Sequence, residues 1–175
     1  MSKLPLFILN NFYVPSQKEK KFLIDKIVTP KIKFNNNHYG EHNVEFTDKS
    51  FNKMMYEKFI NVSKQLLNNF TLHKNNNNKA YVYCTNKNDY HHVWHDHKNT
   101  CSINSVYYLK IPSEEEGQLE IEYKGNRFDF FPKENDFIIF PSYLKHAPKK
   151  PNTDEYRISI NFELLCNEKT EDIFK

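Results

Sequence analysis

The chain has few cysteines and no long hydrophobic run. Its 3 cysteines, Cys84, Cys101 and Cys166, are widely spaced and form no C-x-x-C pair, which argues against a disulfide framework and against a thiolate zinc cluster. An odd number of such cysteines fits a reducing compartment, so we expect a cytoplasmic protein. The apolar run Leu4 to Leu9 is interrupted by Pro5 and is too short to span a membrane, so no membrane partner is expected.

Glycine is also scarce, and the numbers of basic and acidic residues are nearly equal. With 3 glycines and 8 prolines, the turns must come largely from Asn, Asp and Pro. The net charge of +3, from 25 basic and 22 acidic residues, is too small and too scattered to indicate nucleic acid as a partner. Aromatic residues make up 15% of the chain, so Phe and Tyr carry much of the burial. The 175 residues suit a single domain with a sizeable core.

Residues 1–79 are expected to form an N-terminal strand and two supporting helices. Apolar residues of the second helix recur at steps of three and four, which is typical of a helix with one buried face. The expected elements are a strand over Pro5–Phe12, a helix that opens at Pro15 with Ser16 as its cap, a loop over residues 35–43, and a helix over Ser50–Phe70.

Residues 80–165 read as a series of short strands separated by turn residues. This pattern favours an antiparallel sandwich or barrel, so we expect a mainly β (α+β) fold in which two helices support a double-sheet jelly roll. The expected strands are Ala80–Thr85, Tyr90–His97, Ser102–Ile111, Gln118–Tyr123, Arg127–Phe131, Asp136–Phe140 and Glu155–Leu164.

The stretch His95-Asp96-His97 indicates a metal site. Side chains at i and i+2 of a strand share a face, so His95 and His97 could bind one ion while Asp96 points away. His146 follows a strongly apolar strand and could close the site from a neighbouring one. Imidazole suits iron, zinc, copper or nickel, so these ligands do not fix the metal. The alternative is a surface patch of histidines, since His91 and His92 lie beside them.

Three residues of the last strand indicate an anion site. Arg157, Ser159 and Asn161 alternate on one face, while the apolar residues Ile158, Ile160 and Phe162 fill the other. A guanidinium inside a barrel needs an anion, and Arg binds carboxylates through two parallel hydrogen bonds. An ordinary salt bridge from Arg157 to Glu155 or Asp154 explains the arginine equally well.

Taken together, these residues resemble a known enzyme family. The order H-x-(D/H), a distant His and then R-x-S is similar to the 2-oxoglutarate- and iron(II)-dependent oxygenases. The fuller set resembles small, prolyl-hydroxylase-like oxygenases that occur in many phage and bacterial genomes. The similarity covers roughly Tyr81 to Glu163. It is carried by the runs Trp94–His97, Ser105–Leu109, Ile139–Ser142, His146 and Glu155–Phe162.

The resemblance implies a fold, two cofactors and a set of roles. The fold would be a double-stranded β-helix, the cupin-like jelly roll. Iron(II) would be held by His95, His97 and His146, and O₂ would be the oxidant. The distal carboxylate of 2-oxoglutarate, the co-substrate, would pair with Arg157. The residues that would assist in binding this carboxylate are Ser159, Asn161 and either Tyr107 or Tyr108. Strand alternation allows only one of the two tyrosines to face the interior, and Tyr108 is favoured.

One position departs from the family pattern. The facial triad of these enzymes has two histidines and a carboxylate, and here His97 occupies the carboxylate position. Either three imidazoles bind the metal, or a local bulge brings Asp96 in as the alternative ligand.

The leading functional hypothesis is hydroxylation of a C–H bond, coupled to decarboxylation of 2-oxoglutarate to succinate and CO₂. The substrate would be a protein side chain or a small molecule. A second hypothesis is a three-His cupin-type dioxygenase that does not use 2-oxoglutarate, against which Arg157 and Ser159 speak. A third is a non-catalytic jelly-roll binding or assembly module.

Overall fold

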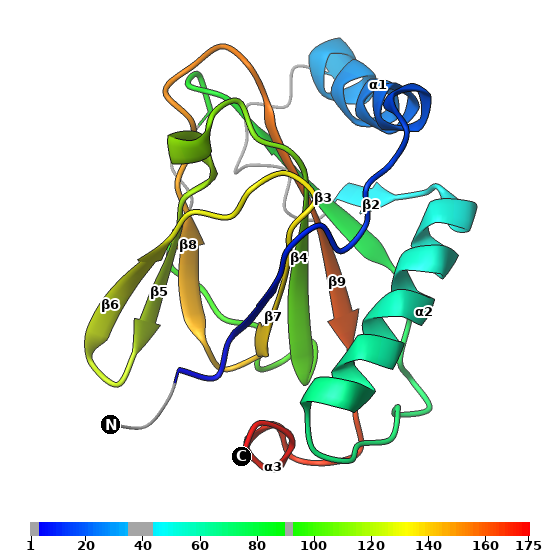
Figure 1. Ribbon diagram of the computed structural model, residues 1–175, viewed down its shortest axis with the longest axis vertical. Coiled ribbons are helices and arrows are strands. Elements are labelled where there is room, and N and C mark those ends of the chain that lie inside the picture. The colour runs from blue at the N-terminus through cyan, green and yellow to red at the C-terminus, as the bar shows by residue number, and fades with distance from the viewer. Residues whose placement is uncertain (1–3, 35–43, 90–92) are drawn as a thin grey trace.

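Two antiparallel sheets face each other and form a jelly roll, as the sequence predicts (Figure 1). The computed structural model describes residues 4–34, 44–89 and 93–175. The larger sheet has the order β1-β7-β4-β9-β3-β2, and the smaller has the order β6-β5-β8. The strands are β1 (Phe7–Leu9), β2 (Val44–Phe46), β3 (Ala80–Thr85), β4 (Ile103–Lys110), β5 (Leu119–Tyr123), β6 (Asn126–Phe130), β7 (Phe137–Pro141), β8 (Lys145–Pro148) and β9 (Arg157–Leu164).

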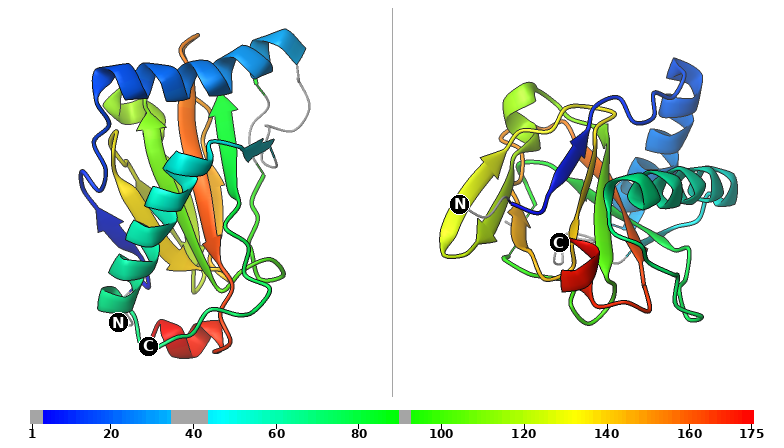
Figure 2. Two further views of the ribbon diagram at one scale, coloured as in Figure 1. Left: turned by 90° about the vertical axis from the view of Figure 1, so that its right-hand side faces the viewer. Right: turned by 60° about the horizontal axis from the view of Figure 1, so that its bottom comes forward.

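Two long helices, α1 (Gln17–Phe34) and α2 (Lys49–Leu66), cover the outer face of the larger sheet (Figure 2). Short helical turns, η1 (Glu114–Gly117) and α3 (Thr170–Ile173), lie outside this layer. Phe59 of α2 packs its ring 5.3 Å from that of Phe137, so the helix seals one apolar layer against the sheet. The two supporting helices expected from the sequence are therefore present.

Strand alternation divides β4 between two cores. Tyr107 and Leu109 belong to the apolar cluster under the helices, whereas Val106 and Tyr108 belong to a second cluster between the two sheets. All four side chains are buried. This division decides which residues of β4 can face an interior pocket.

Several predicted elements agree with the structure to within a few residues. The strand predicted over Ala80–Thr85 coincides with β3. Ser16 caps α1, because its hydroxyl oxygen accepts a hydrogen bond from the Glu19 N–H at 3.2 Å. The second helix ends at Leu66 instead of Phe70, because Leu67 is extended. Phe70 is nevertheless buried, so this apolar residue packs into the core from a loop and not from the helix.

Two predicted segments need correction or lie outside the described residues, and two strands were not predicted. The strand predicted over Tyr90–His97 is wrong where the structure describes it: residues 93–97 form only an isolated bridge, between His95 and His146. The strands β2 and β8 were not predicted, because runs of three and four residues give too little alternation to detect. Residues 90–92, and the predicted loop over residues 35–43, lie outside the described part of the chain.

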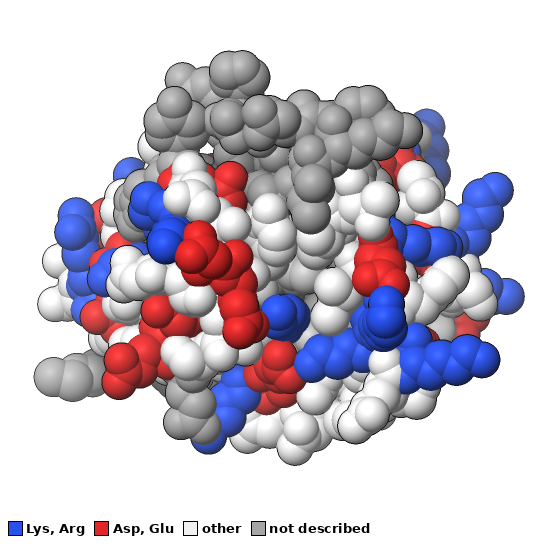
Figure 3. Space-filling view, turned by 90° about the horizontal axis from the view of Figure 1, so that it is seen from above, with Lys and Arg blue, Asp and Glu red and all other residues white. Residues whose placement is uncertain are grey.

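The described surface mixes both charges. Basic and acidic side chains are interspersed on the face shown in Figure 3. Charged side chains of the described residues also form pairs, as in Lys149–Glu120 at 3.1 Å. Among the described residues, no helix has the length and apolar character needed to cross a membrane.

Candidate metal and carboxylate site

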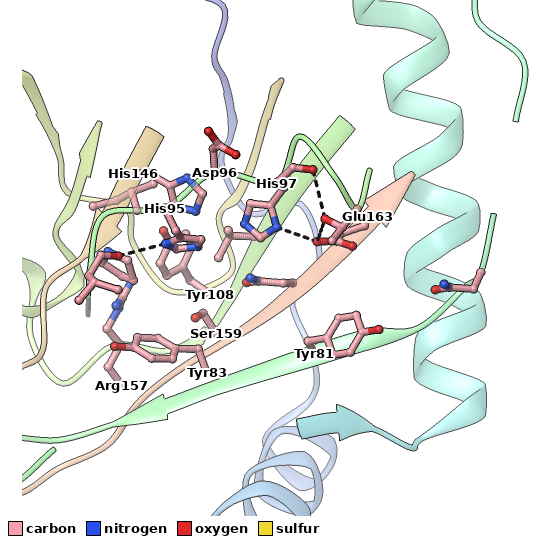
Figure 4. A pocket seen from close by; sticks show the side chains of 17 residues that line it. Tyr81, Tyr83, His95, Asp96, His97, Tyr108, His146, Arg157, Ser159 and Glu163 are labelled. Carbon is pink, nitrogen blue, oxygen red and sulfur yellow. Dashed lines mark hydrogen bonds and ion pairs between the residues drawn. The ribbon is translucent and has the colours of Figure 1, made fainter. Parts of the chain in front are cut away.

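The inner faces of β3, β4 and β9 form the floor of a pocket of about 690 Å³ between the two sheets (Figure 4). The register places Ser159 of β9 opposite Tyr83 of β3 on one side and Tyr108 of β4 on the other. Alternation then brings the inward residues of β9 into a row along the floor. That row consists of Arg157, Ser159, Asn161 and Glu163.

The three histidines of the predicted metal site meet above this floor. His95 and His146 are joined by a two-way backbone bridge, with N···O distances of 3.1 and 3.0 Å. The His97 N–H donates to the Ser142 carbonyl oxygen at 2.8 Å, which fixes the second histidine of the motif at the same sheet edge. The ring centroids lie 4.2 to 5.2 Å apart, and one ligand atom from each ring lies within 4.8 Å of the others.

Hydrogen bonds fix the same tautomer in all three rings. The Nδ1 atoms of His95 and His146 lie 3.1 and 3.0 Å from the backbone carbonyl oxygens of Val93 and Leu144. The Nδ1 atom of His97 lies 2.8 Å from a carboxylate oxygen of Glu163. Each partner accepts, so each Nδ1 carries a proton, and in the neutral ring Nε2 keeps its lone pair.

Burial favours the neutral, metal-binding form of His95 and His146. Desolvation lowers the pKa of His146 well below its usual value, and the adjacent His95 and His97 rings lower it further. Desolvation also lowers the pKa of His95, with His97 as the next cause. The Nε2 atom of His97 is buried and meets no hydrogen-bonding group of the described residues. A cation at the convergence point would satisfy it.

Asp96 lies apart from this cluster. Its carboxylate pairs with the Lys98 ammonium at 3.1 Å and accepts from the Lys98 N–H at 3.3 Å. In Figure 4 it points away from the three rings. Because His97 is already oriented toward His95 and His146, no bulge is needed to complete a three-ligand set.

Arg157 is a buried cation at the other end of the pocket. Its side chain is 1% exposed, and its guanidinium carbon lies 5.4 Å from the centre of the Tyr108 ring. One Nη1–H donates to the Lys149 carbonyl oxygen at 3.3 Å, while Nε–H has no acceptor among the described residues. A charge buried in this way calls for an anion.

The ordinary salt bridges considered for Arg157 are absent from the described structure, because both acids are paired elsewhere. Glu155 pairs with Lys110 at 3.0 Å, and Asp154 pairs with Lys87 at 2.8 Å. The guanidinium is therefore available to a carboxylate that enters the pocket.

The two tyrosines of β4 separate as alternation requires. Tyr108 lines the pocket, where burial raises its pKa while the Arg157 cation opposes the shift. Tyr107 lies on the opposite face, and its hydroxyl is 3.0 Å from the Tyr13 carbonyl oxygen. Tyr107 is therefore removed from the candidate co-substrate residues.

Among the pocket residues that the sequence did not predict, two lie against residues of the predicted site. Tyr83 faces Arg157 across the floor, with its ring centre 5.8 Å from the guanidinium carbon. Glu163 contacts His97. The sequence could have indicated Glu163, because this residue is the next member of the i, i+2 series formed by Arg157, Ser159 and Asn161. Tyr83 requires the β3–β9 register, which the sequence does not give.

Comparisons with known proteins find similarity at the level of structure. Neither a protein-family model nor a curated protein sequence matches the chain. Solved structures do match, with low sequence identity. A prolyl hydroxylase from Trichoplax adhaerens, in complex with a hypoxia inducible factor peptide, has a TM-score of 0.66 at 14% identity, covering 92% of this chain and 83% of that chain.

Two further structures carry 2-oxoglutarate. A viral collagen prolyl hydroxylase from Paramecium Bursaria Chlorella virus-1, in its 2-oxoglutarate complex, has a TM-score of 0.53 at 18% identity, covering 89% of this chain and 92% of that chain. HygX from Streptomyces hygroscopicus, with nickel and 2-oxoglutarate bound, has a TM-score of 0.55 at 12% identity, covering 91% and 81%. The chain thus has the double-stranded β-helix fold of the 2-oxoglutarate- and iron(II)-dependent oxygenases.

Proposed function

We propose that this protein is an iron(II)- and 2-oxoglutarate-dependent oxygenase. It would hydroxylate a C–H bond of a protein side chain or a small molecule while converting 2-oxoglutarate to succinate and CO₂. The observation that carries the proposal is one pocket in which three imidazoles converge at one end and a buried arginine, with no carboxylate partner among the described residues, lies at the other.

The metal end fits iron. His95, His97 and His146 would hold the ion through Nε2, since each Nδ1 is engaged by an acceptor. Three ligands on one side leave further positions for an organic acid and O₂, unlike a closed structural site with four protein ligands. When bound, iron(II) supplies the oxygen-activating chemistry that these side chains lack.

The acid end fits a dicarboxylate. Arg157 would bind the distal carboxylate through charge-assisted hydrogen bonds, with Ser159 and Tyr108 beside it on the same floor. The 2-oxo acid end would then face the histidines. Burial of this end of the pocket excludes water, which strengthens the attraction between guanidinium and carboxylate.

The outer part of the pocket would receive the substrate. Val93, which is 65% exposed, and the side chains of Tyr81 and Asn77 line it. These groups are uncharged, so they fit a neutral substrate segment better than a strongly charged one.

A second candidate function is a three-His dioxygenase that does not use 2-oxoglutarate. The observation in its favour is the absence of a carboxylate from the set formed by His95, His97 and His146. It gives no role to the buried Arg157, which is why we place it second. The two candidates differ in one product, because only the first forms succinate.

The test is uncoupled turnover of 2-oxoglutarate by protein loaded with iron(II) under anaerobic conditions. After admission of O₂, the proposal predicts succinate and CO₂ from the wild type and none from His146→Ala. Oxygen uptake without succinate would favour the second candidate. A protein that binds neither iron nor 2-oxoglutarate at millimolar concentration would be a non-catalytic jelly-roll module.

A further inference from the structure

A carboxylate stands directly behind one of the three histidines. The Glu163 Oε1 atom accepts a hydrogen bond from His97 Nδ1–H at 2.8 Å, on the side of the ring opposite Nε2 (Figure 4). Both side chains are largely buried, with 18% and 13% of their surfaces exposed. Hydrogen bonds to a charged acceptor are about twice as strong as neutral ones, and low exposure protects them from competing water.

The three histidines differ in this respect. His95 and His146 donate to neutral backbone carbonyls, each two residues earlier in the chain. His97 donates to a carboxylate of the described residues, and it is also the residue that occupies the position where the family pattern has a carboxylate ligand. The three predicted ligands carry no negative charge, but the Glu163 carboxylate lies one hydrogen bond away from them, behind His97.

The position of Glu163 is set by the fold. Its backbone N–H donates to the Tyr56 hydroxyl at 3.3 Å, and that hydroxyl donates to the Lys79 carbonyl oxygen at 2.6 Å. Tyr56 belongs to the buried face of α2. The Thr100 hydroxyl also donates to Glu163 Oε1, at 3.4 Å. Tyr56 of the helix layer thus fixes the backbone of Glu163, and Thr100, in the turn after the histidine motif, contacts its carboxylate.

We infer that Glu163 is a positioning residue of the metal centre, acting through His97. This inference rests on the proposed function. The carboxylate holds His97 in the Nδ1–H tautomer, orients the Nε2 lone pair toward the ion, and strengthens the ring as a metal ligand. It also returns negative charge to a centre whose three ligands are all neutral, and this charge stabilises the oxidised state of bound iron relative to the reduced state.

The matched variants are Glu163→Gln and Asp96→Asn. The first keeps an acceptor oxygen for His97 but removes the charge. The second removes one charge from the neighbouring residue, whose carboxylate binds Lys98 instead. Removal of a partner of this kind costs about 10–100-fold in metal affinity. We expect that loss for Glu163→Gln in titrations with Co(II), together with a changed Co(II) absorption spectrum and a more positive Fe(III)/Fe(II) potential. Asp96→Asn should remain close to wild type.

A measurement on the wild type does not depend on the folding of a variant. In nuclear magnetic resonance spectra of the metal-free protein, the Nδ1 proton of His97 should resonate furthest downfield among the three histidines, because its acceptor is charged. The inference is overturned if this signal matches those of His95 and His146, or if Glu163→Gln and Asp96→Asn bind Co(II) alike. Failure of the wild type itself to bind metal would instead reject the proposed function.

Discussion

Replacing Arg157 with Leu should remove the selectivity of the pocket for acids that have a second carboxylate. The guanidinium is 1% exposed and has no carboxylate partner among the described residues, so it contributes its full charge to an entering anion. Truncating one member of a buried, hydrogen-bonded charge pair costs about 2–5 kcal/mol. A loss of about 3 kcal/mol weakens the binding of 2-oxoglutarate by roughly 100-fold.

The assay is calorimetric titration of Mn(II)-loaded protein in the absence of oxygen, first with 2-oxoglutarate and then with pyruvate. Pyruvate has the same 2-oxo acid end but no distal carboxylate, so it serves as the matched control ligand. The wild type should prefer 2-oxoglutarate strongly, and Arg157→Leu should bind the two acids with similar, weak affinity. The reasoning is refuted if the variant keeps its preference, or if both acids lose affinity equally.

The same variant separates binding from folding. In the free protein the Arg157 cation is buried with no anionic partner among the residues that the structure describes, which costs desolvation energy. Arg157→Leu should therefore be at least as stable as the wild type in urea unfolding without ligand. A large loss of stability would show that Arg157 supports the fold, and the binding result would then need a less disruptive variant.

Three further outcomes follow from the packing and the caps. Burial raises the pKa of the Cys101 thiol and raises that of Cys166 to about 12. Both thiols should therefore resist alkylation at pH 8 until the protein is unfolded in denaturant. Rapid labelling of the native protein would contradict the packing. Asp48→Ala removes the N-cap of α2 and should cost about 1 kcal/mol in urea unfolding. The Lys26 ammonium lowers the pKa of Asp48 in the folded state, so this contribution is present above about pH 4 and is lost as the pH falls further; an unchanged difference at lower pH would refute it. Phe162→Ala empties a fully buried position and should cost about 3–5 kcal/mol, whereas a much smaller loss would mean that the core collapses around it.

Sequence periodicity predicted the sheets better than the details of the site. The alternation of Arg157, Ser159 and Asn161 predicted their common face, and the structure places all three along the pocket floor. The alternation between Tyr107 and Tyr108 likewise allowed one inward residue. Such patterns are local, because successive residues of a strand point to opposite faces.

The contacts that complete the site depend on long-range pairing. His95 and His97 lie together although residues 93–97 form no strand, because a two-way backbone bridge to His146 of β8 holds His95 and a hydrogen bond to Ser142 holds His97. Glu163 meets His97 across two segments that are far apart in the chain. No local pattern encodes the contact between Glu163 and His97, which requires the register of β9 with its neighbours.

The most direct test of the central claim is an anomalous difference map from a crystal grown anaerobically with Mn(II) and 2-oxoglutarate. The account predicts a single metal peak bounded by the Nε2 atoms of His95, His97 and His146, with the distal carboxylate of the acid against Arg157. A peak that engages Asp96 in place of His97, or an acid bound away from Arg157, would contradict it.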